Sequence, residues 1–172
     1  MLTGLPRVGK TTMVNYSALD VNIAGATTRE VREGRLRLGF KITNLATGEE
    51  RWLARRGQVR EPRTGPYNVV SADLERIGVV ALQKAVDEPV GPVIVDEIGP
   101  MEMTSGSFRT NVSRLLTGRT PVLATVKFRS HYSEIETARN ASVQLVMTTD
   151  NHEQIYERII AHLDDSSRQA RS

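Results

Sequence analysis

The residues Gly4-Leu5-Pro6-Arg7-Val8-Gly9-Lys10-Thr11 decide the fold, because they match the pattern G-x-x-x-x-G-K-[ST] of a phosphate-binding loop. Glycines let the backbone curl so that successive N–H groups face one point, where the start of a helix adds its partial positive charge. In such a loop Lys10 reaches the β- and γ-phosphates of a nucleoside triphosphate, and the Thr11 hydroxyl ligates Mg²⁺. The pattern arises by chance in under about 1% of chains of this length. Around it we expect a short strand over Met1–Thr3 and a helix over Thr11–Leu19.

A second feature of the sequence is a pair of acidic residues that follows an apolar run. The apolar run Val93-Ile94-Val95 ends at Asp96, as a buried parallel strand with a carboxylate at its carboxyl end would. In that position Asp96 helps the threonine of the loop to hold Mg²⁺, and Glu97 orients and polarises an attacking water. Gly99-Pro100 then predicts a turn that returns the chain towards the site. For Glu102, after this turn, a second acidic group and an exposed loop residue remain equally open.

Apolar residues recur with two periods along the chain, which separates strands from helices. Alternation between Arg35 and Ala54, around Thr47-Gly48, predicts a β-hairpin, and the polar stretch Arg55–Pro66 predicts an exposed loop. Further strands are expected at 122–126 and 143–147. Ser71 is expected to cap an amphipathic helix, a second helix is expected to begin at Ser105, and a third is expected near Ile155.

Strands that alternate with helices indicate an α/β protein. We expect a three-layer α/β/α P-loop NTPase fold with a mostly parallel central sheet and an added antiparallel β-hairpin. The expected organisation is one nucleotide-binding domain over 1–163, with the hairpin at about 35–54, and a flexible C-terminal tail over 164–172.

Composition limits the class of protein further. The 172 residues include no cysteine, which excludes disulfides and thiolate zinc sites. Hydrophobic residues make up 39% and charged residues 25%, values that exclude a wholly disordered chain. No apolar run approaches the roughly 18 residues of a membrane span, and no secretory signal is visible, so we expect a cytoplasmic protein with no membrane partner. The net charge is only +3, but residues 27–67 hold nine arginines and one lysine against five glutamates. Such a basic stretch indicates phosphate ligands or a solvated face.

Six segments together resemble one family. They are GLPRVGKTT, TTREVREGRLRLGFKI, GPYNV, VIVDEIGPMEM, PVLATV and the TTDN that precedes the last helix. In order and spacing they are similar to the small P-loop nucleoside-triphosphatases of thermophiles, known in animals as cancer-related nucleoside-triphosphatase, over about residues 3–160. The resemblance implies Mg²⁺-dependent hydrolysis of ATP, GTP and other triphosphates (CTP, UTP) to the diphosphate and phosphate, with little base preference. It also implies a three-layer fold like that of nucleotide kinases.

Carried over to this sequence, the resemblance implies two nucleotide-binding segments. Their residues are Gly4, Leu5, Pro6, Arg7, Val8, Gly9, Lys10, Thr11 and Thr12, followed by Val95, Asp96, Glu97, Ile98, Gly99, Pro100, Met101 and Glu102. Within them we expect Lys10, which neutralises charge on the β,γ-bridge, and Glu97 to be the catalytic residues. Thr11 and Asp96 are the expected Mg²⁺ ligands.

Two other functions remain open. A nucleotide or nucleoside kinase of the same fold would use the arginine-rich hairpin as its acceptor site or lid, whereas a nucleic-acid-binding protein would grip phosphates with it. The hairpin lacks the interleaved aromatic residues of a base-stacking surface, so nucleic acid is the least favoured partner. Arg29, Arg32, Arg35 and Arg37 are candidates for phosphate contacts, but for each one alone a solvated position is favoured. Nothing in the sequence indicates an oligomeric state.

Overall fold

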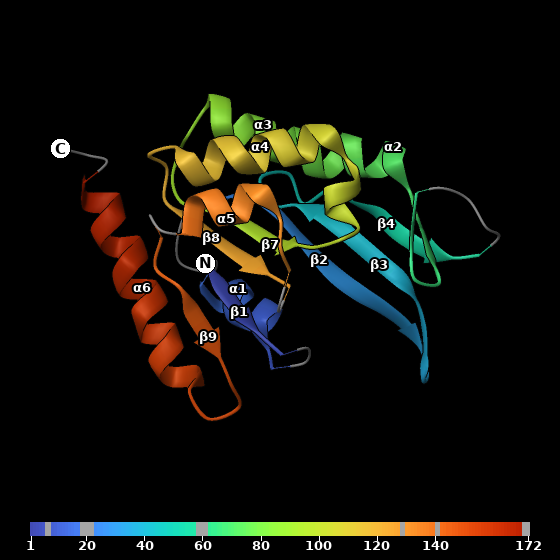
Figure 1. Ribbon diagram of the computed structural model, residues 1–172, viewed down its shortest axis with the longest axis horizontal. Coiled ribbons are helices and arrows are strands. Elements are labelled where there is room, and N and C mark those ends of the chain that lie inside the picture. Colours follow the sequence, from blue (N-terminus) through green and yellow to red (C-terminus); the bar gives the residue numbers. More distant parts are fainter. Residues whose placement is uncertain (6–7, 18–22, 58–61, 128–129, 140–141, 170–172) are drawn as a thin grey trace.

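The architecture is a single wide sheet with helices on both faces (Figure 1). The computed structural model describes residues 1–5, 8–17, 23–57, 62–127, 130–139 and 142–169. The strands are β1 (Leu2–Gly4), β2 (Ala24–Glu33), β3 (Leu36–Asn44), β4 (Glu50–Arg56), β5 (Arg63–Thr64), β6 (Tyr67–Val69), β7 (Val93–Ile98), β8 (Val122–Val126) and β9 (Leu145–Met147). These described strands form one nine-stranded sheet in the order β5-β6-β4-β3-β2-β7-β8-β1-β9.

Helices cover the sheet in two layers. They are α1 (Lys10–Ser17), α2 (Ser71–Asp73), η1 (Leu74–Val79), α3 (Val80–Asp87), η2 (Glu102–Thr104), α4 (Gly106–Thr117), α5 (Ser133–Arg139) and α6 (His152–Gln169). α1 and α6 pack on one face, while α3, α4 and α5 pack on the other (Figure 1). Because β2, β7, β8, β1 and β9 pair in parallel, the predicted three-layer fold with a parallel central sheet is confirmed.

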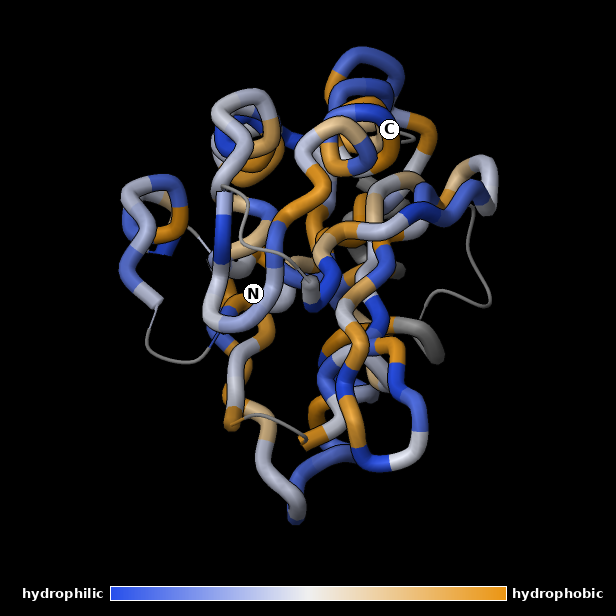
Figure 2. The backbone as a smooth tube through the Cα atoms, turned by 90° about the vertical axis from the view of Figure 1, so that its right-hand side faces the viewer, coloured by the Kyte–Doolittle hydropathy of each residue, from blue (hydrophilic) through white to orange (hydrophobic). Residues whose placement is uncertain are grey.

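The two faces of the central strands supply two separate cores. Ile94 belongs to the cluster formed with Val14 of α1 and Ile159 of α6, whereas its neighbour Val95 belongs to the cluster that contains Phe108 of α4. This alternation follows from the two-residue period of a strand. Figure 2 shows the hydrophobic stretches running along the strands between the helix layers. Residues that read as one apolar run in the sequence therefore hold both helix layers in place.

The predicted hairpin forms, and the antiparallel part of the sheet is wider than it. β3 and β4 pair antiparallel around a turn in which Gly48 has φ 72° and Asn44 Oδ1 accepts a hydrogen bond from the Ala46 N–H at 3.0 Å. β2, which the sequence did not predict, pairs antiparallel with β3 and in parallel with β7. Its polar stretch TTREVRE has little apolar alternation, because beyond Thr27 it pairs with β3 alone and none of its side chains is buried.

Several element boundaries differ from the expectation. The predicted loop over Arg55–Pro66 is wrong in part, because β4 continues to Arg56 and β5 pairs with β6; residues 58–61 lie outside the described part. Ser71 is the first helical residue rather than the cap, and the cap position Val70 makes no side-chain hydrogen bond. Ser105, predicted as the first residue of a helix, is instead the cap of α4 and accepts a hydrogen bond from the Phe108 N–H at 3.0 Å.

The last helix continues into the segment expected to form the C-terminal tail. α6 extends to Gln169, so residues 164–169 are helical; 170–172 lie outside the described part. Each residue added to an existing helix contributes a hydrogen bond without a new nucleation cost, which favours this extension. Among the described helices none is long and apolar enough to cross a membrane.

Candidate active site

The phosphate loop lies between β1 and α1, at the carboxyl end of the parallel strands. Gly4 ends β1 so close to β9 that a Cβ there would lie 2.4 Å from the Met147 carbonyl oxygen. Gly9 has φ +90°, which favours glycine before α1 begins at Lys10. The Lys10 ammonium donates to the carbonyl oxygens of Gly4 at 3.0 Å and Leu5 at 3.3 Å, so it lies over the loop. Pro6 and Arg7 lie outside the described residues.

A buried carboxylate lies beside this loop. Asp96 on β7 is 2% exposed, and Thr125 of the neighbouring β8 donates a hydrogen bond to its Oδ1 at 2.5 Å. Burial raises the pKa of Asp96, while hydrogen bonds from the Thr125 and Thr11 hydroxyls and the charge of Lys10 lower it. The other oxygen, Oδ2, is buried and has no hydrogen-bond partner among the described residues. The structure thus brings Asp96 close to Lys10 and Thr11, although Asp96 follows Thr11 by 85 residues in the sequence.

The donor set around Asp96 Oδ2 suits a magnesium ion. Mg²⁺ in nucleotide enzymes is bound through one or two carboxylates or hydroxyls plus phosphate and water oxygens. The Thr11 hydroxyl, which lowers the pKa of the same carboxyl group, and the unpartnered Oδ2 provide two such oxygens. The described residues contain no group of three or more His, Cys, Asp or Glu side chains able to hold a metal by themselves, as expected where the nucleotide supplies the remaining ligands.

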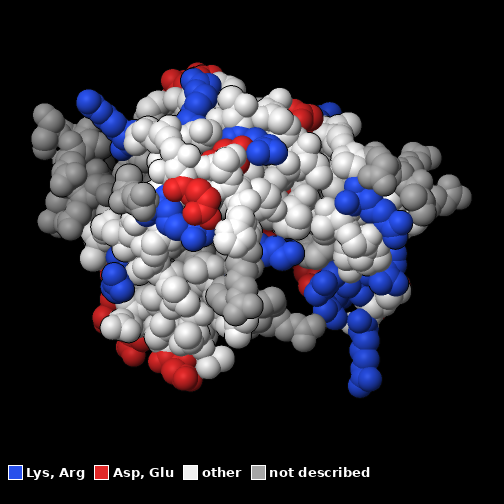
Figure 3. Space-filling model, in the orientation of Figure 1, with Lys and Arg blue, Asp and Glu red and all other residues white. Residues whose placement is uncertain are grey.

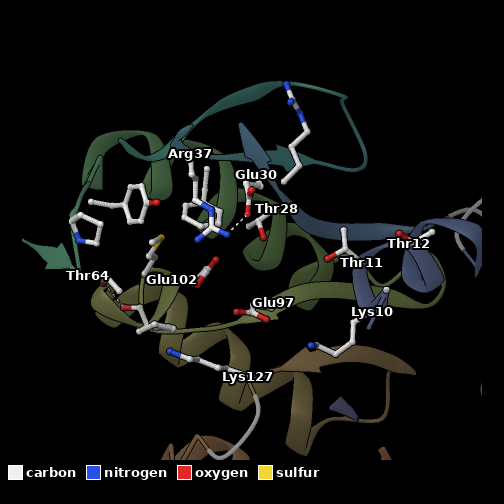
Figure 4. Close-up of a pocket in the computed structure, with 18 residues that line it drawn as sticks. Lys10, Thr11, Thr12, Thr28, Glu30, Arg37, Thr64, Glu97, Glu102 and Lys127 are labelled. Carbon is white, nitrogen blue, oxygen red and sulfur yellow. Dashed lines mark hydrogen bonds and ion pairs between the residues drawn. The ribbon is translucent and has the colours of Figure 1, made fainter. Parts of the chain in front are cut away.

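A cleft of about 750 Å³ opens in front of these residues (Figure 4). Eight residues of the predicted segments line it: Gly9, Lys10, Thr11, Thr12, Glu97, Pro100, Met101 and Glu102. It is also lined by residues outside the two predicted nucleotide-binding segments: Thr28, Arg29, Glu30, Arg37, Phe40, Thr64, Gly65, Pro66, Tyr67 and Lys127. The carboxyl end of the sheet forms one wall, and the projecting β2–β3 hairpin with the β5–β6 turn forms the other.

Other residues of the two predicted segments do not line the cleft. Val95 and Ile98 are buried in the core, Val8 packs against it, and Leu5 is 59% exposed. Gly99 has a different role, because a Cβ there would lie 3.0 Å from Glu97 Oε1 and 2.9 Å from Glu102 Oε2. The described members that lie outside the cleft therefore support it from the core and the loop.

The two glutamates around Gly99 are held in unlike environments. Glu97 is half-buried; burial and the charge of Asp96 raise its pKa, while Lys10 and Lys127 lower it. Glu102 is 4% exposed, and burial raises its pKa to about 8, although backbone N–H groups at Glu102 and Gly99 hydrogen-bond its carboxyl. The alternative that Glu102 is an exposed loop residue is wrong. At neutral pH Glu102 is mainly a protonated, neutral acid beside the cleft.

The basic hairpin contributes selectively to the cleft. Figure 3 shows Lys and Arg side chains gathered at this edge of the molecule. Arg29 lines the cleft but is half-exposed and bound to Glu50 at 2.6 Å. Arg37 also lines it, and its NH2 contacts Glu30 Oε2 at 2.6 Å. Arg32 and Arg35 are exposed and do not line the cleft, in agreement with the alternative that they occupy solvated positions.

Comparison with known proteins agrees with this arrangement. The family model described as NTPase matches residues 1–160. Nucleoside-triphosphatase THEP1 of Thermofilum pendens is 45% identical over 138 residues, covering 77% of this chain and 75% of the relative. The protein of the same name from Thermotoga maritima is 40% identical and covers 95% of this chain and 94% of the relative. The crystal structure of THEP1 from the hyperthermophile Aquifex aeolicus is similar with a TM-score of 0.80 and 27% identity, covering 95% of this chain and 97% of that one. The chain belongs to this NTPase family.

Proposed function

We propose that the protein hydrolyses nucleoside triphosphates to the diphosphate and phosphate with the help of Mg²⁺. The observation that carries this proposal is the convergence of Lys10, Thr11 and Glu97 on one cleft, with the buried Asp96 carboxylate next to Glu97 in the chain and its Oδ2 without a hydrogen-bond partner among the described residues. The relatives named nucleoside-triphosphatase support the same reaction. ATP, GTP, CTP and UTP are all substrates in this proposal, because every proposed contact addresses the phosphates that these nucleotides share.

The phosphate loop binds and neutralises the triphosphate. Backbone N–H groups of the loop point at the phosphates, and the helix start at Lys10 adds its partial positive charge. Lys10 leaves the carbonyl oxygens of Gly4 and Leu5 and neutralises charge on the β,γ-bridge. Thr11 and Asp96 Oδ2 hold the Mg²⁺, which when bound offsets the charge that develops on the phosphate oxygens.

Glu97 orients the water that attacks the γ-phosphorus. It lines the cleft, is half-buried, and lies in the field of Lys10 and Lys127. The oxygen of the water bonds to phosphorus as the bond to the β,γ-bridging oxygen breaks, and the products are the diphosphate and inorganic phosphate. No covalent enzyme intermediate is needed, so catalysis depends on positioning and on electrostatic stabilisation.

Release of phosphate from the four triphosphates, with Mg²⁺ and without an acceptor, tests this proposal. We expect release from all four by the wild-type protein, and a loss of about 100-fold or more in Lys10→Ala and in Glu97→Gln. Glu97→Gln keeps its affinity for ATP, because the substitution removes the carboxylate without altering the phosphate loop. Arg35→Met, on the exposed hairpin turn, is the matched control and turns over like wild type. A wild-type rate in Lys10→Ala would overturn the assignment of the loop.

A further inference from the structure

The cleft continues past the point of attack on the γ-phosphate. Figure 4 shows Lys10, Thr11 and Thr12 to one side of Glu97, and Glu102, Arg37 and Thr64 to the other. In the proposed reaction Lys10 and Thr11 hold the triphosphate and Glu97 marks the nucleophile. An in-line displacement puts the nucleophile opposite the leaving diphosphate. The part of the cleft beyond Glu97 therefore lies on the nucleophile side.

Arg37 is fixed in this second part of the cleft with a donor left over. Its NH2 binds Glu30 at 2.6 Å, and its guanidinium lies over the Phe40 ring at 5.4 Å from the centroid. The side chain is 33% exposed, yet its Nε is buried and has no hydrogen-bond partner among the described residues. The exposed part of the guanidinium lines the cleft, where an oxygen of an anionic ligand can accept a hydrogen bond from it.

Two further groups make this region suitable for an anion. Lys127, at the end of β8, is exposed, and its ammonium makes no ion pair or hydrogen bond with any residue that the structure describes. Glu102 is mainly protonated at neutral pH, so it can donate a hydrogen bond and adds little negative charge. We name Arg37, Glu102 and Lys127 the acceptor subsite.

We infer that the acceptor subsite binds a phosphate monoester, such as a nucleoside monophosphate, and that this ligand takes the γ-phosphoryl group in place of water. The inference rests on the proposed function for the triphosphate and goes beyond it, because it adds a second substrate. The choice of a monoester over an uncharged hydroxyl compound follows from the two cations. A guanidinium and an ammonium match a dianionic phosphate, whereas a neutral acceptor would leave the Lys127 ammonium without an ion-pair partner among the described residues and the Arg37 guanidinium with Glu30 alone.

The transfer step balances without a further reactant. An oxygen of the monoester, already deprotonated at neutral pH because the second pKa of such phosphates is about 6, attacks the γ-phosphorus. The bond between the γ-phosphorus and the β,γ-bridging oxygen breaks, and that oxygen leaves on the diphosphate. One triphosphate and one monophosphate thus give two diphosphates. Hydrolysis is the same displacement with water as the nucleophile, and it dominates when no monoester is bound.

Transfer of label from γ-labelled ATP tests the inference directly. The acceptors are AMP, GMP, CMP, UMP and ribose 5-phosphate, which separate nucleotides from other monoesters. We expect labelled diphosphate of at least one acceptor beside labelled phosphate. In Arg37→Met and in Lys127→Met the ratio of transfer to hydrolysis falls by about 10- to 100-fold, the loss expected for one charged hydrogen bond. Arg35→Met, which lies outside the cleft, keeps the wild-type ratio.

Calorimetric binding of diadenosine pentaphosphate provides a readout that does not need turnover. This molecule joins a donor and an acceptor nucleotide, so we expect it to bind wild type about 100-fold more tightly than ADP, and Arg37→Met to lose most of that advantage. Hydrolysis of ATP with no labelled diphosphate from any acceptor, and pentaphosphate binding no tighter than ADP, would overturn the inference and leave the proposed function standing. Transfer without hydrolysis would support the inference and overturn the proposed function. Absence of both reactions would overturn both.

Discussion

Replacing Glu102 by glutamine tests how strongly the raised pKa of this buried glutamate makes the free energy of unfolding depend on pH. Glu102 is 4% exposed, and its pKa is raised from the ordinary 4.5 to about 8, chiefly by burial. Between these two pH values the folded protein holds a proton on Glu102 that the unfolded chain has released. The stabilisation from this group is therefore fully present below pH 4.5 and is lost as the pH rises to about 8.

The difference between the two pKa values gives the size of the effect. Each pKa unit corresponds to about 1.4 kcal/mol, so the wild-type protein loses at most about 5 kcal/mol of unfolding free energy through Glu102 across this range. Glutamine has nearly the same shape, can accept the same backbone N–H bonds and does not ionise. We therefore expect Glu102→Gln to match wild type at the acidic end and to be more stable by several kcal/mol at the alkaline end.

Urea unfolding at a series of pH values from about 5 to 8, followed by circular dichroism, measures this difference. Glu157→Gln is the control, because Glu157 is exposed on α6 and its substitution leaves the wild-type pH dependence intact. If wild type and Glu102→Gln differ by less than about 0.5 kcal/mol at every pH, Glu102 ionises as freely in the folded protein as in the unfolded chain. That result would refute the argument from burial.

Two further predictions concern the free energy of unfolding, measured in urea. Thr125→Val removes the donor to Asp96 Oδ1, so we expect it to lower this free energy by about 1.5–3 kcal/mol. The control Thr137→Val, at an exposed position of α5, has little effect, and equal losses in the two variants would contradict the role of the buried hydrogen bond. Gly25 has φ +117°, and Gly25→Ala places a Cβ 1.9 Å from a carbonyl oxygen of β7. We therefore expect this variant to lose more than about 3 kcal/mol of unfolding free energy or to unfold without a cooperative transition. The control Gly106→Ala has no atom within 4 Å of the added Cβ and unfolds like wild type. A cooperative Gly25→Ala protein of wild-type stability would show that β2 does not need this close approach to β7.

Local patterns in the sequence predicted the elements that present the nucleotide site. The phosphate loop is a continuous motif, and the strand that ends at Asp96 is a continuous apolar run, so both can be found without knowledge of the fold. The same holds for α4, whose cap Ser105 and buried face through Phe108 are encoded within a few residues. Each of these features depends on interactions between neighbours in the chain.

The opposite wall of the cleft depends on strand register and could not be predicted in this way. Arg35 and Arg37 are the same type of residue and lie two positions apart in the sequence, yet of these two only Arg37 lines the cleft. Pairing of Arg32 with Arg37, beyond an irregularity at Val31 and Arg32, brings Arg37 to Glu30. Apolar alternation does not reveal this irregularity, because the alternation of Leu36, Leu38 and Phe40 along β3 continues through it and does not specify the partner residues on β2.

Glu102 shows a second limit of local patterns. A turn at Gly99 predicts that the chain returns, but not how deeply the next residues are buried. That depth follows from packing of η2 beneath the cleft, where Met101 and Met103 join the core on either side of Glu102. Burial of a charged residue between two apolar neighbours is a property of the assembled layers, so the sequence left its environment open.

The position of β1 in the sheet determines when the phosphate loop can take shape as the chain is made. β1 pairs with β8 and β9, and the Met1 ammonium donates to the Val143 carbonyl oxygen at 2.7 Å, 142 residues away in the chain. β1 is thus completed by strands that follow it by more than 100 residues, and contacts of such long sequence separation form late and slowly. A nascent chain that has not yet produced residues 122–147 has no partner strands for β1 and no anchored loop. Nucleotide binding is therefore available only after β8 and β9 have been synthesised.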